Sequence, residues 1–353
     1  MLTEKQVLEI REHLERAQNP IFFFDNDQDG LCSFLLLQRY SEKGKGIPIK
    51  SFPELTAEYF RRVGELNADY IFVLDKPIIS EDFLNEARQV KLPIVWIDHH
   101  HVEDLKIPEG VFYYNPVWGN KKNNEPVSAL CYQVCHKKED LWISFVGCIS
   151  DAHIPDFYDE FKEKYPDLLS DSADDALDIF YSSEIGKVAQ IFGAGLKDKT
   201  TNVINMLRFL AKVKTPYEVL EENSKNYFMH KRFSEIDRKY KKLIGDAVKI
   251  PPDSDEILFF EYGGELSISS ELANGLKHKF PKKFIVVGYL SGAKINISIR
   301  GKNVRKIILE VVKKIDGATG GGHEDAVGAK VNSKYWELFK KEFEKQVLDK
   351  NND

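Results

Sequence analysis

The chain has 353 residues, a length typical of two domains. Hydrophobic residues make up 42% of it and charged residues 30%, a composition that excludes a disordered protein. The net charge of −6 excludes a uniformly basic nucleic-acid-binding protein, although an average of this kind hides how the charges are distributed.

In chain order, the pattern first predicts a helix that begins after the N-cap Thr3 and ends at Ala17. Short apolar runs follow, and helical stretches separate them. Continuous apolar strands that alternate with helices predict a parallel sheet covered on both faces. The expected strands are Ile21–Phe24, Ile47–Phe52, Ile71–Leu74 and Ile94–Ile97, and the helices are Leu31–Tyr40, Ala57–Leu66 and Glu81–Val90.

The rest of the chain is helical in pattern up to Pro251-Pro252 and then becomes a smaller α/β pattern. We therefore expect a parallel-sheet domain at 1–190, a helical linker at 191–252 and a smaller α/β domain at 253–353. The helices expected before the break are Val127–Lys137, Trp142–Ser150 and Asn226–Val248. The elements expected after it are strands Ile257–Tyr262, Phe284–Tyr289, Ile295–Ile299 and one near Val327, helices Ser270–Lys279, Val304–Lys314 and Trp336–Val347, and a glycine-rich loop.

Several features that the sequence lacks predict the compartment in which the protein is found. No stretch approaches the roughly 18 apolar residues of a membrane span, and the charged stretch from Met1 to Ala17 does not have the pattern of a signal peptide. The four cysteines include no Cys-x-x-Cys pair, so buried thiols are favoured over a zinc site at Cys131, Cys135 and His136. We expect a cytoplasmic protein with no membrane partner.

The charges are distributed unevenly. From Leu272 to Lys306 there are nine lysine and arginine residues and no acidic residue, whereas acids strongly outnumber bases from Asp151 to Asp178. This asymmetry fits a basic lobe that binds a phosphate-rich polymer and an acidic lobe that binds metal. The alternative for the basic stretch is a solvated, lysine-rich face.

Acidic residues follow three of the expected parallel strands. Asp25, Asp27 and Asp29 come after the first strand, Asp75 after the third and Asp98 after the fourth. Because ligands bind at the carboxyl ends of the strands in such sheets, these acids should converge at one edge. Three strands that each deliver an acid there predict a site.

The residue types at this edge indicate a metal centre. The run from Asp25 to Gly30, in which every second residue up to Asp29 is Asp, forms a divalent-cation loop; an EF-hand is excluded because its twelfth position is Leu36. Asp98-His99-His100 adds histidine, which favours Mn²⁺, Fe²⁺ or Zn²⁺ over an all-oxygen site. Asp151 is a further candidate ligand. We expect Mn²⁺, with Mg²⁺ as the alternative ion.

These motifs resemble those of the DHH phosphoesterase superfamily, in the same order and at similar spacing, and the D-x-D-x-D-G form resembles its RecJ branch. Thr319-Gly320-Gly321-Gly322-His323, followed by Ala326 and Gly328, resembles the GGGH signature of the DHHA1 domain. The resemblance implies an N-terminal DHH domain, a C-terminal DHHA1 domain and hydrolysis of phosphodiester bonds with two metal ions. It is closest to the compact archaeal-type RecJ-like nucleases.

The resemblance also implies a role for each matching residue of the acidic edge. Asp27 would bind the first ion, with Asp25 close to it. In some family members a histidine upstream of the first acids is a metal ligand; this chain has Phe22-Phe23-Phe24 there, so Asp25 would have to substitute for it. The second ion would be held by Asp29, His99 and Asp151, and Asp75 would bridge both ions. Asp98 would orient the histidines, and His100 would face the scissile phosphate and stabilise its charge.

For the second domain, the resemblance implies substrate binding. Ser298-x-Arg300 would reach a substrate phosphate, and the arginine would grip it with two hydrogen bonds. Backbone N–H groups of successive glycines would form an anion-binding nest, with one histidine as a further donor. The residues concerned are Ser298, Arg300, Gly320, Gly321, Gly322 and His323.

Three functions remain open from the sequence. The leading hypothesis is a single-strand-specific exonuclease that releases mononucleotides from DNA or RNA, with the 3′→5′ direction favoured by resemblance. The second is a small-substrate phosphoesterase, such as an oligoribonuclease, a phosphoadenosine phosphate phosphatase or a cyclic-dinucleotide hydrolase. The third is a non-catalytic scaffold that binds replication or repair proteins. The expected partners are therefore single-stranded DNA or RNA, with replication or repair proteins as a further class.

Overall fold

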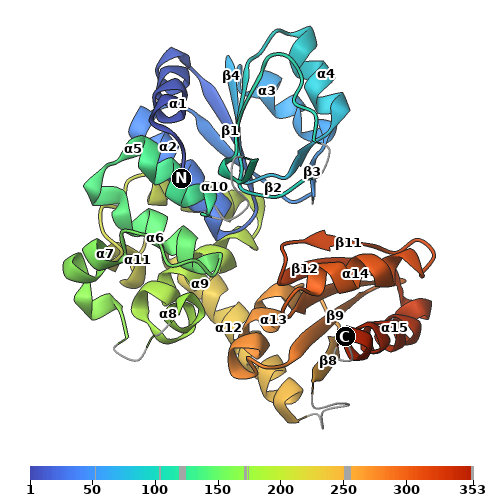
Figure 1. Ribbon diagram of the computed structural model, residues 1–353. Helices are drawn as coiled ribbons and strands as arrows, with labels where there is room; N and C mark the ends of the chain where they lie inside the picture. The colour runs from blue at the N-terminus through green and yellow to red at the C-terminus, as the bar shows by residue number, and fades with distance from the viewer. Residues whose placement is uncertain are drawn as a thin grey trace. The chain divides into compact units, whose positions relative to one another are not determined.

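The computed structural model describes residues 1–51, 53–102, 105–118, 125–170, 173, 175–249 and 256–350. The chain forms two compact units, unit 1 (Met1–Ser234) and unit 2 (Glu235–Asp353) (Figure 1). Within the described residues, no helix combines the length and the apolar character needed to cross a membrane.

Unit 1 is built around a parallel sheet with the strand order β2-β1-β4-β6-β7. The predicted parallel sheet is confirmed, and the structure adds an edge strand, β7, that the sequence analysis did not predict. The strand predicted at Ile47–Phe52 is β2, which begins and ends earlier than predicted. The last residue of the prediction, Phe52, falls outside the described residues. The strands are β1 (Pro20–Asp25), β2 (Lys45–Ile49), β4 (Tyr70–Leu74), β6 (Ile94–Ile97) and β7 (Val111–Tyr114).

Alternate residues of the strands pack into two different cores, which explains why the strands are apolar throughout. Phe22 and Phe24 contribute to the larger core, together with buried residues of α1 (Glu4–Arg16), α2 (Gln28–Ser41), α5 (Val127–Cys135) and α6 (Leu141–Ser150). Ile21 and Phe23 contribute to the smaller core, together with Val63 of α3 (Arg61–Glu65) and residues of α4 (Glu81–Gln89). Helices therefore cover both faces of the sheet, as Figure 1 shows.

The first helices lie close to where the sequence predicts them. Thr3 caps the first one, and its side chain exchanges hydrogen bonds with Gln6 in a capping box. The helix predicted at 57–66 is split into a 3₁₀ turn (Ala57–Tyr59) and a short α-helix. The helices are α1 (Glu4–Arg16), α2 (Gln28–Ser41), α3 (Arg61–Glu65), α4 (Glu81–Gln89), α5 (Val127–Cys135) and α6 (Leu141–Ser150), and a two-stranded ladder pairs β3 (Glu54–Leu55) with β5 (Ile78–Ile79).

The helices that follow pack as part of unit 1. Phe192, Met206 and Val219 lie in its larger core, so this part of the predicted linker is buried against the first domain. The two units divide between Ser234 and Glu235, inside the helix at Tyr227–Lys249. These helices are α7 (Tyr158–Lys164), α8 (Ala176–Ser182), α9 (Glu184–Leu196), α10 (Thr200–Leu210), α11 (Tyr217–Leu220) and α12 (Tyr227–Lys249).

Unit 2 contains a mixed sheet with the strand order β11-β12-β10-β9-β8. Among the strands that the structure describes there, β8 and β9 pair in parallel, and the other neighbours are antiparallel. The predicted smaller α/β domain is confirmed. Its elements are β8 (Ile257–Tyr262), α13 (Ser269–Lys279), β9 (Phe284–Ser291), β10 (Lys294–Arg300), α14 (Val304–Lys313), β11 (Thr319–Gly322), β12 (Ala326–Asn332) and α15 (Trp336–Lys350).

The glycine-rich segment of unit 2 differs from the prediction. It is the edge strand β11 rather than a loop, with Gly321 paired to Gly328 of β12. A Cβ atom on Gly320 would lie 2.7 Å from a side-chain carbon of Ile308 in α14, so glycine allows the strand to pack closely against this helix. Gly322, where the strand ends, has a positive φ of 141°.

Candidate metal centre

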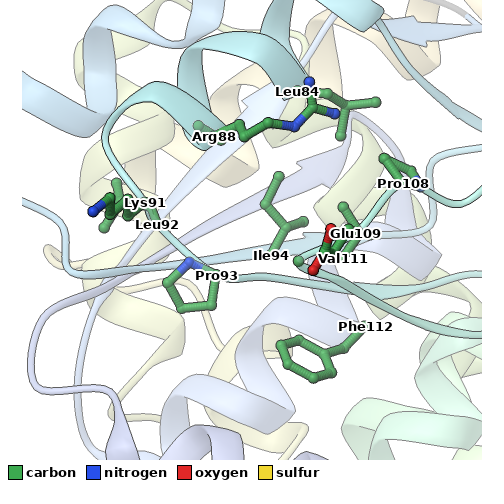
Figure 2. Close-up of a pocket in the computed structure, with 12 residues that line it drawn as sticks. Leu84, Arg88, Lys91, Leu92, Pro93, Ile94, Pro108, Glu109, Val111 and Phe112 are labelled. Atoms are coloured by element: carbon green, nitrogen blue, oxygen red, sulfur yellow. The ribbon is translucent and has the colours of Figure 1, made fainter.

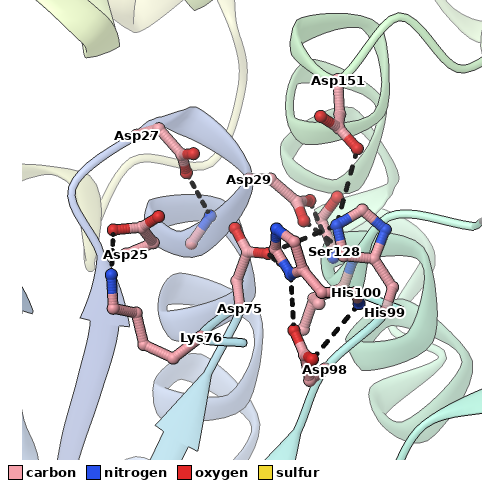
Figure 3. A network of polar contacts seen from close by, with 12 residues as sticks. Asp25, Asp27, Asp29, Asp75, Lys76, Asp98, His99, His100, Ser128 and Asp151 are labelled. Carbon is pink, nitrogen blue, oxygen red and sulfur yellow. Dashed lines mark hydrogen bonds and ion pairs between the residues drawn. The ribbon is translucent and has the colours of Figure 1, made fainter. Parts of the chain in front are cut away.

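The three strand-end acids lie on adjacent strands, because β1, β4 and β6 are neighbours in the sheet. The backbone N–H of Asp75 donates to Ile97 O at 3.0 Å, and that of Asp98 donates to Tyr114 O at 3.0 Å. Asp75 has a φ of 57°, so the chain turns sharply at the end of β4. As predicted, the acids from these strands gather at one edge of the sheet (Figure 3).

Asp29 joins this edge from the first turn of α2. It is buried, and its carboxylate accepts hydrogen bonds from two backbone N–H groups at the start of α5, Val127 N at 2.8 Å and Ser128 N at 2.9 Å. The N-terminus of a helix favours an anion, so α5 both fixes Asp29 and stabilises its charge. The sequence analysis assigned no such role to these two amides, because α5 follows Asp29 by about a hundred residues.

The described ligand atoms of Asp29, Asp75 and His99 all lie within 4.8 Å of one another. His99 Nε2 is 3.4 Å from Asp75 Oδ1 and 3.7 Å from Asp151 Oδ2. All three members of the group are buried, and Asp151 follows directly after α6. Two carboxylates and an imidazole, with a third carboxylate beside them, fit a divalent ion that accepts both oxygen and nitrogen.

The electrostatics of this group also favour a cation. Burial raises the pKa of Asp75 well above its usual range, and the Asp27 and Asp29 carboxylates add to the effect. Burial likewise raises the pKa of Asp29, although the nearby His99 opposes the change. For His99, burial alone would lower the pKa, but Asp75, Asp151 and Asp29 raise it above its usual range. A divalent ion bound by these groups would favour the charged carboxylates and a neutral His99 and so relieve these pKa shifts.

Asp98 and His100 form a hydrogen-bonded pair beside the group. His100 Nδ1 lies 2.8 Å from Asp98 Oδ1, and the backbone N–H of His100 donates to Asp98 Oδ2 at 3.2 Å. Asn115 holds the pair in place, since its Nδ2 donates to His100 O at 2.9 Å. Ligand atoms of Asp75, Asp98 and His100 also lie within 4.8 Å of one another, so Asp75 belongs to both groups. Asp98 thus contacts His100, one of the two histidines that it was predicted to orient, and the orienting role stays a prediction.

Asp25 and Asp27, the expected ligands of a first ion, are engaged differently. Asp27 caps α2, with its Oδ1 accepting from Gly30 N at 3.0 Å. Asp25 Oδ1 lies 3.0 Å from Nζ of Lys76, a fully buried lysine. Among the described residues, neither acid belongs to a group of three side chains close enough to share one ion. The sequence analysis missed Lys76; its signal was a charged residue placed between the Asp75 turn and Pro77.

The predicted substrate-binding residues lie on the sheet of unit 2. Arg300 Nε donates to Asn274 Oδ1 at 2.5 Å, and its Nη2 donates to Ser270 Oγ at 2.8 Å, so α13 holds the guanidinium. Ser298 pairs with Gly328 of β12, which in turn pairs with Gly321 of β11. A Cβ atom on Gly321 would meet nothing within 4 Å, so the sheet is open there. His323 follows β11 directly.

Unit 1 also contains a cavity of about 350 Å³ that is separate from the acids. It lies where β6 and β7 begin, at the opposite end of the strands from the metal centre, and it is mostly apolar (Figure 2). Arg88, Lys91 and Glu109 are its charged lining residues. No member of the predicted site lines it.

Comparison with known proteins finds a family match within the second unit. Residues 256–349 match the DHHA1 domain family. RecJ from Thermus thermophilus, solved in complex with Mn²⁺, matches 98% of this chain and 54% of its own at 14% identity, with a TM-score of 0.71. A DHH domain from a member of a family of ribosomal proteins matches 98% and 90% at 15% identity, with a TM-score of 0.72. CDC45 from Entamoeba histolytica matches 97% and 98% at 9% identity, with a TM-score of 0.56.

These matches confirm the predicted DHHA1 domain and the RecJ-like fold of the whole chain. No curated protein matches the chain in sequence. The chain spans 54% of the length of the T. thermophilus RecJ, so activities of the longer protein do not transfer to this one by fold alone.

Proposed function

We propose that this chain, with its DHHA1 domain and RecJ-like fold, is a metal-dependent phosphodiester hydrolase that releases mononucleotides from single-stranded DNA or RNA. The observation that carries the proposal is the buried group of Asp29, Asp75 and His99, whose ligand atoms lie within 4.8 Å of one another. The pKa values of these three buried groups are shifted by burial and by one another, a pattern that is typical of functional sites.

A divalent ion bound by these residues, with Mn²⁺ as the preferred ion, would lower the pKa of a bound water and offset the charge of a phosphate. The chain's own residues prepare the site for this. The α5 amides fix the Asp29 carboxylate. Asp98 fixes the His100 ring beside Asp75 and Asn115 holds the His100 backbone, so that the position of the ring is set before a phosphate arrives. We assign His100 to stabilising charge on that phosphate.

Unit 2 supports a substrate that carries phosphate groups. Asn274 and Ser270 hold the Arg300 guanidinium, which grips phosphate through paired hydrogen bonds in many proteins. The open stretch of sheet at Ser298, Gly328 and Gly321 lies in register on neighbouring strands. The nine lysine and arginine residues between Leu272 and Lys306 favour a polymer over a small molecule. The 3′→5′ direction is part of the proposal and rests on resemblance alone.

The test is a digest of single strands of about 20 nucleotides, DNA and RNA, labelled at either end, with Mn²⁺ and without it. We expect metal-dependent release of mononucleotides from the 3′ end by the wild-type chain and none by Asp75→Ala. The matched control is Asp82→Ala, since Asp82 is an exposed acid on α4. Cleavage of dinucleotides but not of long strands would replace the exonuclease with a small-substrate phosphoesterase. Absence of cleavage on all of these substrates would favour the scaffold function.

A further inference from the structure

Lys76 lies directly after Asp75 and is fully buried. A buried ammonium group is stable only when it is paired, and Lys76 Nζ lies 3.0 Å from Asp25 Oδ1 and 2.7 Å from Ser51 O. Its backbone is also held, because its carbonyl oxygen accepts a hydrogen bond from Trp96 Nε1 at 2.7 Å. The positive charge is therefore fixed in place as part of the folded unit.

The positive charge of Lys76 affects how well Asp25 can bind a metal ion. Asp25 Oδ1 faces both Lys76 Nζ and the backbone N–H of Asn26, at 3.0 and 2.9 Å. Figure 3 shows Lys76 reaching Asp25 on one side of the acidic edge. A carboxylate that an ammonium already neutralises is a weak ligand, and a dication next to it would be repelled by the lysine.

The other side of the edge is held by different groups. In the described chain, Asp75 and Asp151 form their ion pairs with histidines rather than with lysine or arginine, and Asp29 accepts from backbone amides. These acids and His99 lie together on the opposite side in Figure 3. The acidic edge is therefore divided into a half that can receive a metal cation and a half that already contains an ammonium.

We propose that this protein binds one divalent ion tightly, at Asp29, Asp75 and His99 with Asp151 beside them, and that the Lys76 ammonium takes the place of a second ion by neutralising Asp25. This inference rests on the proposed function, because it concerns the same metal centre. It departs from the two-ion site that the resemblance implies.

The test measures how many Mn²⁺ ions the full chain binds, by isothermal titration calorimetry and by the electron paramagnetic resonance signal of the bound ion. We expect one tight ion for the wild type, with the signal of an isolated Mn²⁺. Lys76→Met keeps the volume and removes the charge, so we expect a second ion to bind at least about tenfold more tightly than to the wild type, with a spin-coupled signal. The double variant Asp25→Asn with Lys76→Met should return to one ion.

Lys43→Met is the matched control, because Lys43 is a half-buried lysine of unit 1 whose Nζ donates to Ala17 O at 2.9 Å, away from the acids. It should bind one ion, like the wild type. Two tight ions in the wild type would overturn the inference, whether or not Lys76→Met folds, and so would a single ion in a folded Lys76→Met variant. If the wild type binds no Mn²⁺, the proposed function itself fails. If two ions bind and Asp75→Ala abolishes cleavage, only the inference fails.

Discussion

The two sheets of this protein present polar groups in different ways. In unit 1 all strands of the main sheet run parallel, so the carboxyl ends of β1, β4 and β6 meet at one edge, and each of these ends carries an acid. In unit 2 most strands are antiparallel, and Ser298, Gly328 and Gly321 are brought together by their register across the sheet. The first arrangement concentrates negative charge for a metal, and the second opens a face beside the Arg300 donors. Under the proposed function, unit 1 carries out the chemistry and unit 2 binds the substrate.

The largest expected effect comes from Asp29→Asn, which tests the role of unit 1. The substitution keeps the shape of the side chain but removes the charge that a metal requires. We expect kcat on single-stranded substrate to fall by about 10³-fold or more, and Mn²⁺ affinity to fall with it. Single-turnover cleavage and calorimetry would measure the two effects.

Asp159→Asn is the control for this variant, since Asp159 is an exposed acid of α7 in the same unit. It should leave both quantities within about twofold of the wild type. An Asp29→Asn variant that keeps its kcat would break the assignment of chemistry to unit 1.

Arg300→Lys tests the role of unit 2 and should have a smaller effect. Lysine keeps the charge but cannot present the paired donors of a guanidinium, nor bridge Asn274 and Ser270 as Arg300 does. We expect KM to rise about tenfold, with kcat changed by less than about threefold. Steady-state kinetics on single strands would separate the two effects.

Lys313→Gln is the control for Arg300→Lys, because Lys313 is exposed on α14 of the same unit and pairs locally, with Glu310 at 2.7 Å. Its KM should match that of the wild type. If Arg300→Lys lowers kcat and leaves KM unchanged, then unit 2 takes part in the chemical step and the division of roles is wrong.

The sequence predicted the acidic edge well, for a simple physical reason. Each of Asp25, Asp75 and Asp98 stands at the end of an apolar run, and parallel strands must bring their ends to one edge. His99 was predicted as a ligand and His100 as the group that faces the scissile phosphate, with Asp98 orienting both. In the structure His99 Nε2 lies 3.4 Å from Asp75 Oδ1 and His100 Nδ1 lies 2.8 Å from Asp98 Oδ1, and the roles stay predictions. The positions of the two histidines were predictable because they directly follow Asp98 in sequence and Asp98 stands at the end of a parallel strand.

The features that sequence reasoning missed depend on contacts between distant segments. Nothing local shows that Lys76 is buried against Asp25, since the pairing depends on how β1 and β4 align. The α5 amides reach Asp29 only through the packing of α2 against α5. The strand β11 looks like a loop in sequence because glycine has no strand preference, and its pairing with β12 overrides that.

The smallest expected effect is on stability, and it should be confined to unit 1. The pKa values of buried Asp29 and Asp75 are raised in the folded chain without metal. A carboxyl group whose pKa is higher in the folded state than in the unfolded state contributes stability that is fully present below the unfolded-state pKa of about 4. This contribution is lost as the pH rises through the folded-state pKa. The raised pKa of His99 acts with the same sign. The metal-free protein should therefore become less stable as the pH rises from about 5 to about 8.

Mn²⁺ should reverse this loss, because it replaces the protons and binds only the folded unit. We expect the melting temperature in the presence of a chelator to fall by several degrees over this pH range, and Mn²⁺ to raise it most at the upper end. Hydrogen exchange should slow at the acidic edge, in β1, β4 and the start of α5, and remain unchanged in β10 and β12 of unit 2. A metal effect of equal size on both units would mean that the ion does not bind where the acids of unit 1 converge.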